Sequence, residues 1–366
     1  MNICIVATIC KETGALSIYN QLMFHLIEEQ KAGEHYYIFI EPSMPMHALK
    51  DAHYIKYSTN GIKNRLKFDK KDFRKKCNEL GIKPDVILSL NNSGVKYKGV
   101  RQYVYYHQSI PLYDYKVNSL NKASLIFRFY QKILPLYIKK SLTKDTLVIV
   151  QTNLMRNLFA KKYKFPLEKI FVAFPDIKQV NGESIAPYSF NDNCFHFIYP
   201  ATKGIYKEHF VLVKALDLIQ ESLRSRIRIH FTLSKDDKPI LKKLIDKAGL
   251  SQHFIFHGSI PHNELLSMYK ASHGLLFPSR IETIGLPLLE AASFGIPIIA
   301  NDINFVHEVL KNYDGLKTVP VHDYKQWSEE IIQLCKPVTR YKEYSLDRRS
   351  DWNAIINMMK EEQSKQ

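Results

Sequence analysis

The chain has 366 residues, of which 45% are hydrophobic and 24% are charged, a composition that excludes a fibrous protein and a largely disordered one. This length exceeds what one hydrophobic core usually organises, so it predicts two domains. No apolar run reaches the roughly 18 residues of a membrane span. The first residues lack the basic segment and cleavage site of a secretory signal, so we expect a cytoplasmic protein. The five cysteines are scattered without a Cys-X-X-Cys pair, which favours a reducing compartment and argues against a zinc knuckle.

The formal net charge of +16 is distributed unevenly along the chain. Residues 1–180 hold 29 Lys and Arg against 14 Asp and Glu, a net charge of +15. The remaining residues hold 23 basic and 22 acidic side chains, a net charge of +1. A basic excess confined to one half favours an anionic partner, which is a membrane face, a phosphorylated substrate or a nucleic acid.

Short apolar runs alternate with amphipathic stretches in the first half of the chain. This alternation is typical of βαβ units and predicts a parallel, doubly wound sheet. The predicted strands are residues 2–8, 36–40, 86–90, 103–107, 147–150 and 170–174, and the predicted helices are residues 16–30 and 154–164.

The same pattern restarts after a polar stretch, so we expect two α/β domains with a ligand cleft between the carboxyl ends of their sheets. The predicted boundaries are an N-terminal domain at 1–180, a linker at 181–193, a C-terminal domain at 194–340, and a final helix within 341–366 that packs back on the N-terminal domain. The strands expected in the second domain are residues 195–199, 227–233, 254–256, 274–277 and 297–300, and the helices are 207–221, 238–248, 263–271 and 286–294.

The segment 274–310 carries the strongest motif, a strand followed by a tight loop, a helix, a glycine stop and another strand. Gly285 lies at the expected helix start, and Gly295 with Pro297 lies at its end. The backbone N–H groups of Ile284, Gly285 and Leu286 have no partner within the helix, so with the helix dipole they form an anion site suited to a diphosphate.

This segment resembles the signature of the GT-B glycosyltransferases, most closely glycosyltransferase family 4, also called group 1. The family pattern has two glutamates seven residues apart in a defined context of Pro, Ser, Gly and Ala. The matching residues here are Pro278, Ser279, Glu282, Gly285, Leu286, Pro287, Glu290, Ala291, Gly295 and Pro297. The resemblance covers most of the C-terminal half and implies two Rossmann-like domains that face each other across a cleft.

The resemblance also implies roles for particular residues. Glu290 would bind the ribose hydroxyls of a sugar nucleotide, and Glu282 would lie beside the donor sugar. Lys207 would stabilise the charge of the departing diphosphate, and Lys203 is a candidate for the second cation, since the family's upstream Arg is absent at its common spacing. The remaining positions expected at the nucleotide are Phe256, His257, Gly258 and Ile260 under the base, and Thr283, Ile284, Gly285 and Leu286 at the diphosphate.

Two features of the N-terminal half match the family by short fragments. Thr13 and Gly14 follow the first strand and resemble the glycine loop beside the donor phosphates and the acceptor. His107 follows a strand, where the resemblance implies a position near the donor sugar, and a neutral imidazole there could serve as a hydrogen-bonding or acid–base group. Gln108 and Ser109 are further candidates for sugar contacts.

Two basic stretches, 63–76 and 123–140, hold much of the positive charge. In the second stretch, basic residues alternate with aromatic ones, a pattern that suits an interfacial helix on anionic lipid, with a break at Pro135. We expect Phe127 and Tyr130 to enter the lipid, and we expect the protein to associate peripherally with the inner face of the cytoplasmic membrane.

The leading prediction is a retaining glycosyltransferase that moves a sugar from a nucleoside diphosphate, UDP before GDP, to a lipid-linked glycan of a bacterial surface polysaccharide such as O-antigen or capsule. No resident cofactor and no essential metal are expected. One alternative is a sugar-nucleotide epimerase or phosphorylase of the same architecture, which product analysis with and without an acceptor would separate. A nucleic-acid-binding protein is the non-enzyme alternative, but it leaves the two glutamates unexplained.

Overall fold

The computed structural model describes residues 1–11, 13–117, 122–176, 185–336, 340–344 and 350–361. The chain forms two compact units, one comprising Met1–Ile177 and Arg348–Gln366 and the other Lys178–Asp347. The start of the predicted linker, residues 181–184, lies outside the described residues, and residues 185–194 contain neither helix nor strand. Within the described ranges, every helix is too short or too polar to cross a membrane.

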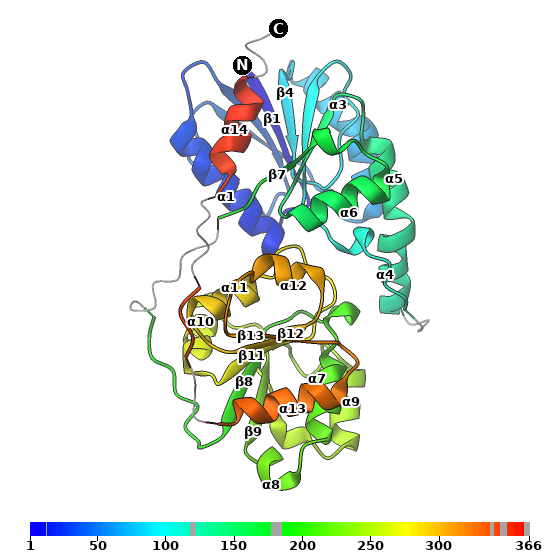
Figure 1. Ribbon diagram of the computed structural model, residues 1–366. Helices are drawn as coiled ribbons and strands as arrows, with labels where there is room; N and C mark the ends of the chain where they lie inside the picture. Colours follow the sequence, from blue (N-terminus) through cyan, green and yellow to red (C-terminus); the bar gives the residue numbers. More distant parts are fainter. Residues whose placement is uncertain (12, 118–121, 177–184, 337–339, 345–349, 362–366) are drawn as a thin grey trace. The chain divides into compact units, whose positions relative to one another are not determined.

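The first unit contains a seven-stranded parallel sheet with the strand order β3-β2-β1-β4-β5-β6-β7 (Figure 1). Chain order reverses direction between β1 and β4, which creates the switch point where α/β sheets bind ligands at their carboxyl ends. The strands are β1 (Asn2–Ala7), β2 (His35–Ile40), β3 (Ala52–Lys56), β4 (Val86–Ser89), β5 (Arg101–Tyr106), β6 (Thr146–Val150) and β7 (Ile170–Val172).

Helices cover both faces of this sheet, as the alternation of apolar strand residues requires. Ile3 and Ile5 point into a core shared with α1 and α14, whereas Cys4 and Val6 point to the opposite core with α3. The helices are α1 (Thr13–Glu29), α2 (Ile62–Lys67), α3 (Phe73–Glu79), α4 (Lys122–Lys132), α5 (Leu134–Ser141), α6 (Asn153–Tyr163) and α14 (Trp352–Glu361), with a π-helical turn η1 (Phe68–Asp72) and 3-10 turns η2 (Ile110–Leu112) and η3 (Leu167–Lys169).

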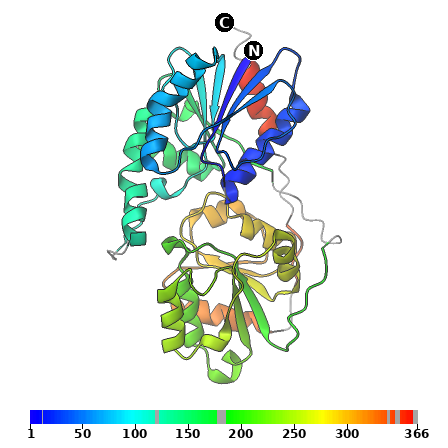
Figure 2. The same ribbon diagram turned by 180° about the vertical axis from the view of Figure 1, so that it is seen from behind.

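The C-terminal helix α14 belongs to the first unit and lies along α1 (Figure 2). Trp352 is fully buried, and its ring stacks on Tyr105 with 5.1 Å between centroids. Its indole N–H donates a hydrogen bond of 3.0 Å to Gln21, and Lys360 forms a buried ion pair of 2.9 Å with Glu34. These contacts fasten the end of the chain to the N-terminal sheet.

The basic stretch 123–140 forms two helices, α4 and α5, and the predicted break near Pro135 is confirmed because Pro135 lies in the first turn of α5. The expectation that Phe127 enters lipid is wrong. Phe127 is buried against the protein, and its ring packs edge-on against Tyr115 at 5.4 Å. The apolar side chains that α4 and α5 expose are Leu125, Ile126, Ile133 and Leu136.

The second unit repeats the architecture with a six-stranded parallel sheet in the order β10-β9-β8-β11-β12-β13. The helices α7, α9 and α13 cover one face, and α10, α11 and α12 cover the other (Figure 1). The strands are β8 (Phe195–Tyr199), β9 (Ile227–Phe231), β10 (Phe254–Phe256), β11 (Gly274–Phe277), β12 (Ile298–Asn301) and β13 (Leu316–Val319). The helices are α7 (His209–Asp217), α8 (Glu221–Arg224), α9 (Pro239–Lys247), α10 (His262–Ala271), α11 (Leu286–Ser293), α12 (Asn304–Val309) and α13 (Tyr324–Leu334), with 3-10 turns η5 (Ile205–Lys207) and η6 (Ser251–His253).

The helix predicted over residues 207–221 is wrong in its extent. Glu208 adopts a left-handed conformation with φ of 51°, which separates the turn η5 from α7. The chain then leaves the helix after Asp217 and re-enters it at Glu221. This interruption places Lys207 in a turn ahead of the helix, where its side chain can reach the neighbouring loop.

Candidate active site

The switch point of the second sheet lies between β8 and β11, which are adjacent in the sheet although far apart in sequence. The loop after β8 carries Lys207, and the loop after β11 carries Glu282. Both side chains therefore lie at the sheet edge where α/β folds bind ligands.

Lys207 and Glu282 form an ion pair between the lysine Nζ and the carboxylate Oε1. Only 11% of the Lys207 side chain and 15% of the Glu282 side chain are exposed. The ammonium group also lies 5.5 Å from the ring of Tyr206 and 6.0 Å from that of Phe277. An ion pair enclosed by aromatic rings is poorly screened by water, so its charges act strongly on a bound ligand.

Main-chain contacts hold these two loops together. The backbone N–H of Arg280 donates to the carbonyl of Tyr206 at 2.9 Å, and the Arg280 guanidinium lies 3.7 Å from the Glu208 carboxylate. Tyr199 of β8 donates its hydroxyl hydrogen to the carbonyl of Lys207 at 2.5 Å. These contacts hold the loop that carries Lys207 against the loop that carries Glu282.

Helix α11 begins beside this pair, after the N-cap residue Gly285. Gly285 has φ of +69°, and a Cβ at this position would lie 3.1 Å from Leu288 and 3.2 Å from Phe305. Leu286 is the first helical residue, and Thr283 and Ile284 lead into the cap. Pro287 has no backbone N–H, and the Leu288 N–H donates to the Gly285 carbonyl at 2.8 Å. The donors that this helix end can present to an anion are therefore the N–H groups of Gly285 and Leu286.

Glu290 lies in the middle of α11 with 14% of its side chain exposed. Its carboxylate accepts a hydrogen bond of 2.9 Å from Nε2 of His262, the first residue of α10. Burial and the negative charge of Glu290 raise the pKa of the Tyr269 hydroxyl on α10 well above its ordinary value. Glu290 is thus an oriented carboxylate at the sheet edge, and His262 is a partner that the sequence did not identify.

The predicted base-binding turn follows β10 directly. The N–H of His257 donates to the carbonyl of Phe231 at 3.0 Å, and that of Gly258 donates to Leu233 at 2.9 Å. Gly258 has φ of +73°, a conformation that favours glycine. Phe256 ends β10, and Ile260 is half-buried two residues after Gly258, so all four predicted residues lie at the carboxyl end of this strand.

Two further lysines lie near the Lys207 loop. Lys203, the predicted second cation, is 68% exposed and is 3.4 Å from Asp237. Lys238 was not predicted as a site residue, because in the sequence it is an ordinary lysine at the start of the predicted helix 238–248. Its Nζ lies 3.3 Å from the Gly204 carbonyl and 3.1 Å from His209 Nδ1, and burial lowers its pKa to about 8.

In the first unit, His107 directly follows β5 and is held by Asn92, which follows β4. The His107 backbone N–H donates to Asn92 Oδ1 at 2.7 Å, and the Asn92 amide lies 3.4 Å from His107 Nε2. Within the described part of the chain, the buried His107 Nδ1 has no hydrogen-bond partner. Burial, with a smaller contribution from Arg65, lowers the His107 pKa to about 4, so the imidazole is neutral at pH 7. Gly14 is exposed in the first turn of α1, which begins three residues earlier than predicted.

Arg65 has no distinguishing signal in the sequence, because it lies within a run of basic residues. Its guanidinium donates to the Asn91 carbonyl at the end of β4 and lies 3.3 Å from the Ser93 hydroxyl. Ser93 in turn donates 2.8 Å to the buried Asp69, which also accepts the Tyr137 hydroxyl. This network anchors the loop that carries Asn92 and therefore His107.

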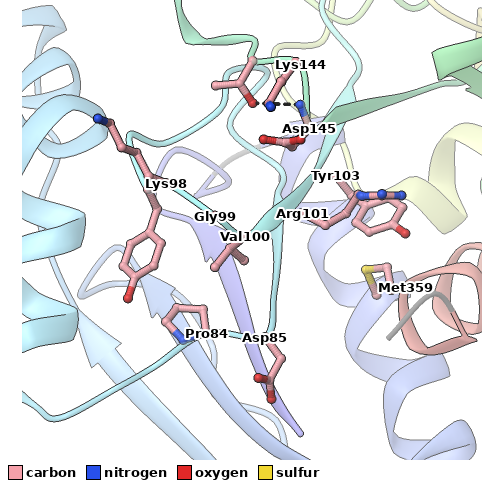
Figure 3. Close-up of a pocket in the computed structure, with 12 residues that line it drawn as sticks. Pro84, Asp85, Lys98, Gly99, Val100, Arg101, Tyr103, Lys144, Asp145 and Met359 are labelled. Atoms are coloured by element: carbon pink, nitrogen blue, oxygen red, sulfur yellow. Dashed lines mark hydrogen bonds between the residues drawn. The ribbon is translucent and has the colours of Figure 1, made fainter. Parts of the chain in front are cut away.

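A cavity of about 760 Å³ in the first unit lies at the opposite edge of the sheet (Figure 3). It opens between the amino ends of β4, β5 and β6 and is lined by Asp85, Arg101, Asp145 and Met359 of α14. It is therefore distinct from the sheet edge that carries His107.

Residues 182–345 match the family of glycosyl transferases group 1. Among curated relatives, the O-antigen chain mannosyltransferase RfbU of Salmonella typhimurium is 25% identical over 65% of this chain and 67% of its own length. The O-antigen chain mannosyltransferase B of Escherichia coli is 29% identical over 33% of this chain and 32% of its own length.

Solved structures share the fold over nearly the whole chain. WaaG, a glycosyltransferase involved in lipopolysaccharide biosynthesis, aligns with a TM-score of 0.67 at 14% identity over 92% of this chain and 90% of its own. HepE of Anabaena, solved in complex with UDP-glucose, aligns with a TM-score of 0.65 at 13% identity over the full length of both chains. At these identities the similarity establishes the GT-B fold.

Proposed function

This chain carries the domain of the group 1 glycosyl transferases and is a glycosyltransferase. We propose that it transfers a sugar from a nucleoside diphosphate to a hydroxyl group of a glycan. UDP is the favoured nucleotide and GDP the next. One observation carries the proposal: the enclosed Lys207–Glu282 ion pair lies at the switch point of the second sheet, beside the start of α11.

The charges at this sheet edge suit a nucleoside diphosphate sugar. Lys207, the backbone N–H groups of Gly285 and Leu286 and the dipole of α11 offer positive charge to the diphosphate. Glu290 offers two carboxylate oxygens to a ribose diol, and Glu282 offers acceptors to the sugar hydroxyls. Lys207 and Glu282 form an ion pair with each other. When the donor binds, each of the two side chains replaces this contact with a contact to the donor.

In the proposed reaction, the bond between the anomeric carbon and the diphosphate oxygen breaks while an acceptor hydroxyl forms the new glycosidic bond. Lys207 stabilises the negative charge that the leaving oxygen gains, an effect that is strong in an enclosed site. The proton of the acceptor hydroxyl is transferred to the departing nucleoside diphosphate or to a base beside the acceptor. Retention of the anomeric configuration is proposed from the resemblance to the family, and the neutral imidazole of His107 is proposed to contact the transferred sugar.

The donor and the products are tested together. The purified chain is incubated with UDP-, GDP-, ADP- and dTDP-sugars, with and without a lipid-linked glycan, and both products are identified by mass spectrometry and NMR. We expect acceptor-dependent release of nucleoside diphosphate and a glycoside with the donor's anomeric configuration. Release of an epimerised sugar without acceptor would favour the epimerase alternative, and an inverted anomer would contradict retention. Because Lys207 and α11 supply the positive charge, chelation by EDTA should leave the rate unchanged.

We further propose that the acceptor is a lipid-linked precursor of a bacterial surface polysaccharide. Two of the relatives are named as O-antigen chain mannosyltransferases, which supports a glycan acceptor of this class. The net charge of +15 over residues 1–180 suits the anionic phosphates of such a carrier and of the membrane that holds it.

A basic and apolar surface on α4 and α5 supports peripheral association with the inner face of the cytoplasmic membrane. Leu125, Ile126, Ile133 and Leu136 are each at least half exposed, and Lys132, Lys139 and Lys140 are exposed beside them. Each basic residue near an anionic bilayer contributes about 1 kcal/mol, which salt screens.

Vesicle co-sedimentation tests this surface. We expect binding to vesicles that contain phosphatidylglycerol, a decrease with added salt, and release when Lys132, Lys139 and Lys140 are replaced by Gln. The matched control replaces Lys325, Lys336 and Lys342 of the second unit. Equal binding to neutral and anionic vesicles, or loss with the control triple variant alone, would contradict the proposal.

A further inference from the structure

A chain of three histidines crosses the second sheet and ends at the turn after β10. His196 of β8, His230 of β9 and His257 after β10 are linked by ring hydrogen bonds. His196 Nδ1 lies 2.9 Å from His230 Nε2, and His230 Nδ1 lies 2.8 Å from His257 Nε2. At its far end, His196 Nε2 lies 2.7 Å from Asp192 Oδ1. We call these four residues the histidine chain.

The histidine chain is enclosed for most of its length. His196 is 4% and His230 is 5% exposed, and Phe190 stacks on His196 with 3.9 Å between ring centroids. Burial lowers the pKa of all three imidazoles, that of His230 to about 3. The three rings are therefore neutral near pH 7.

Neutrality fixes the direction of every hydrogen bond in the chain. The Asp192 carboxylate can only accept, so His196 carries its single ring hydrogen on Nε2. His196 Nδ1 is then an acceptor, which requires the hydrogen of His230 on Nε2. By the same argument His257 carries its hydrogen on Nε2, and its Nδ1 has a free electron pair. A carboxylate three links away thus sets the tautomer of His257.

His257 lies at the same sheet edge as the candidate active site. It follows β10, and the turn of residues 257–261 leads directly into His262, whose ring binds Glu290. The opposite end of the histidine chain, at Asp192, precedes the amino end of β8. Only the His257 end therefore lies where a nucleoside held by Glu290 would place its base.

We propose that the histidine chain makes His257 Nδ1 a hydrogen-bond acceptor for the nucleobase, so that the enzyme selects bases with a ring N–H. This inference rests on the proposed nucleoside diphosphate donor. Uracil, thymine and guanine have a ring N–H on their pairing edge, whereas adenine and cytosine have an unprotonated ring nitrogen there. His257 is thus a specificity residue, and Asp192, His196 and His230 are positioning residues that act through it.

Two measurements test this proposal on the full chain. The first is ¹⁵N NMR of protein labelled at histidine, which distinguishes protonated from unprotonated ring nitrogens. We expect hydrogen on Nε2 and none on Nδ1 in the three residues, and a shift of the His257 Nδ1 signal when UDP is added. A protonated Nδ1 on His257 at pH 7.5 would overturn the proposal.

The second measurement is calorimetric binding of UDP, GDP, ADP and CDP to three variants. His257→Leu should weaken UDP and GDP binding by about fivefold, the effect of one neutral hydrogen bond, and leave ADP and CDP within about twofold. His257→Gln keeps an acceptor and a donor and should restore most of the preference. His307→Leu is the matched control, because His307 also pairs with a carboxylate, Asp302 at 2.6 Å, but lies outside the histidine chain.

The positioning role has its own variant, Asp192→Ala, at the partly exposed end of the histidine chain. In this variant we expect the second tautomer of His257 to appear in the NMR spectrum and the ratio of UDP affinity to ADP affinity to decrease. The melting temperature should fall by no more than it does in His307→Leu. If His257→Leu still binds nucleotides and keeps the preference for UDP and GDP over ADP and CDP, the inference is overturned. Absence of binding by any nucleotide to the unmodified protein would instead contradict the proposed function.

Discussion

In the second unit, the candidate residues Glu282, Gly285 and Glu290 lie within nine consecutive positions on one loop and one helix, whereas in the first unit His107 depends on Asn92 and Arg65 from separate elements. Both units share the strand order of a doubly wound sheet. The difference therefore lies in the loops and side chains at the carboxyl edge of each sheet. A site on one continuous segment is readable as a motif, but a site assembled from several loops is readable only after folding.

The electrostatic character of the two units differs as well. Residues 1–180 carry +15 and the rest of the chain +1, yet the second unit holds the enclosed Lys207–Glu282 pair. In the proposed function, the first unit attracts an anionic acceptor over a broad basic surface, and the second binds the donor with a few oriented charges.

The largest effect is expected for Lys207→Ala in the second unit. In the proposed reaction, Lys207 binds the diphosphate in both the ground state and the transition state, and this interaction becomes stronger as the leaving oxygen gains negative charge. We therefore expect kcat/KM to fall by roughly 10²–10³-fold. Steady-state kinetics with the identified donor measures this. Because the substitution leaves Glu282 without its partner, the double variant Lys207→Met with Glu282→Gln serves as the control for stability. Wild-type kinetics in a folded Lys207→Ala protein would remove this residue from the site.

A smaller effect is expected for His107→Ala in the first unit. We expect kcat to fall by about 10²-fold, the lower range for a positioned acid–base or hydrogen-bonding group, while the affinity for the nucleotide alone stays unchanged. His47→Ala is the matched control, because His47 is also a half-buried histidine of the first unit and bonds Asn20 at 3.0 Å. A parallel loss of nucleotide affinity in His107→Ala would break the proposed division between the units.

The smallest effect concerns the stability of the two units in acid. Burial lowers the His230 pKa to about 3, so between pH 6.5 and 3 the unfolded chain binds a proton that the folded unit excludes. Stability therefore falls as the pH falls through this window, by on the order of 2 kcal/mol at pH 5 from His230 alone, and is constant above about pH 7. In the first unit, His107 makes a similar contribution because its pKa is about 4.

Hydrogen exchange at pH 7.5 and pH 5 separates the two units in one experiment. In the second unit, burial also lowers the pKa of His196, His209 and His257, so its amides should lose more protection than those of the first unit. The variant His230→Leu should remove part of that difference. Equal losses in both units would show that the histidine chain is not the acid-sensitive element.

Much of the fold could be predicted because the buried strands are apolar runs that need no tertiary information. The edge strands β3 and β13 were missed, since they are short and half-exposed and each contains a lysine, Lys56 and Lys317. The interruption at Glu208 was missed because its left-handed conformation has no sequence signal of the kind that glycine provides.

The candidate site shows the same limit. The glutamates and Gly285 were found because they share one segment, and Lys207 was found through the resemblance to the family. The ion pair between Lys207 and Glu282, and the partner His262 of Glu290, were not predicted. Lys207 lies 75 residues from Glu282 and His262 lies 28 residues from Glu290, so only the strand order brings them together. The histidine chain spans β8, β9 and β10 and was not predicted for this reason.

The central claim is that Glu290 on α11 binds the ribose of a nucleoside diphosphate, and isothermal titration of UDP and GDP into Glu290→Ala tests it most directly. Charge-assisted hydrogen bonds contribute about 1.5–3 kcal/mol, so the affinity for the nucleotide bound by the unmodified protein should fall by about 10- to 100-fold. Glu329→Ala is the matched control, since Glu329 is an exposed carboxylate of α13 that pairs with Lys325 at 3.7 Å, and it should bind as the unmodified protein does. Unchanged UDP and GDP affinities in a folded Glu290→Ala protein would contradict the claim.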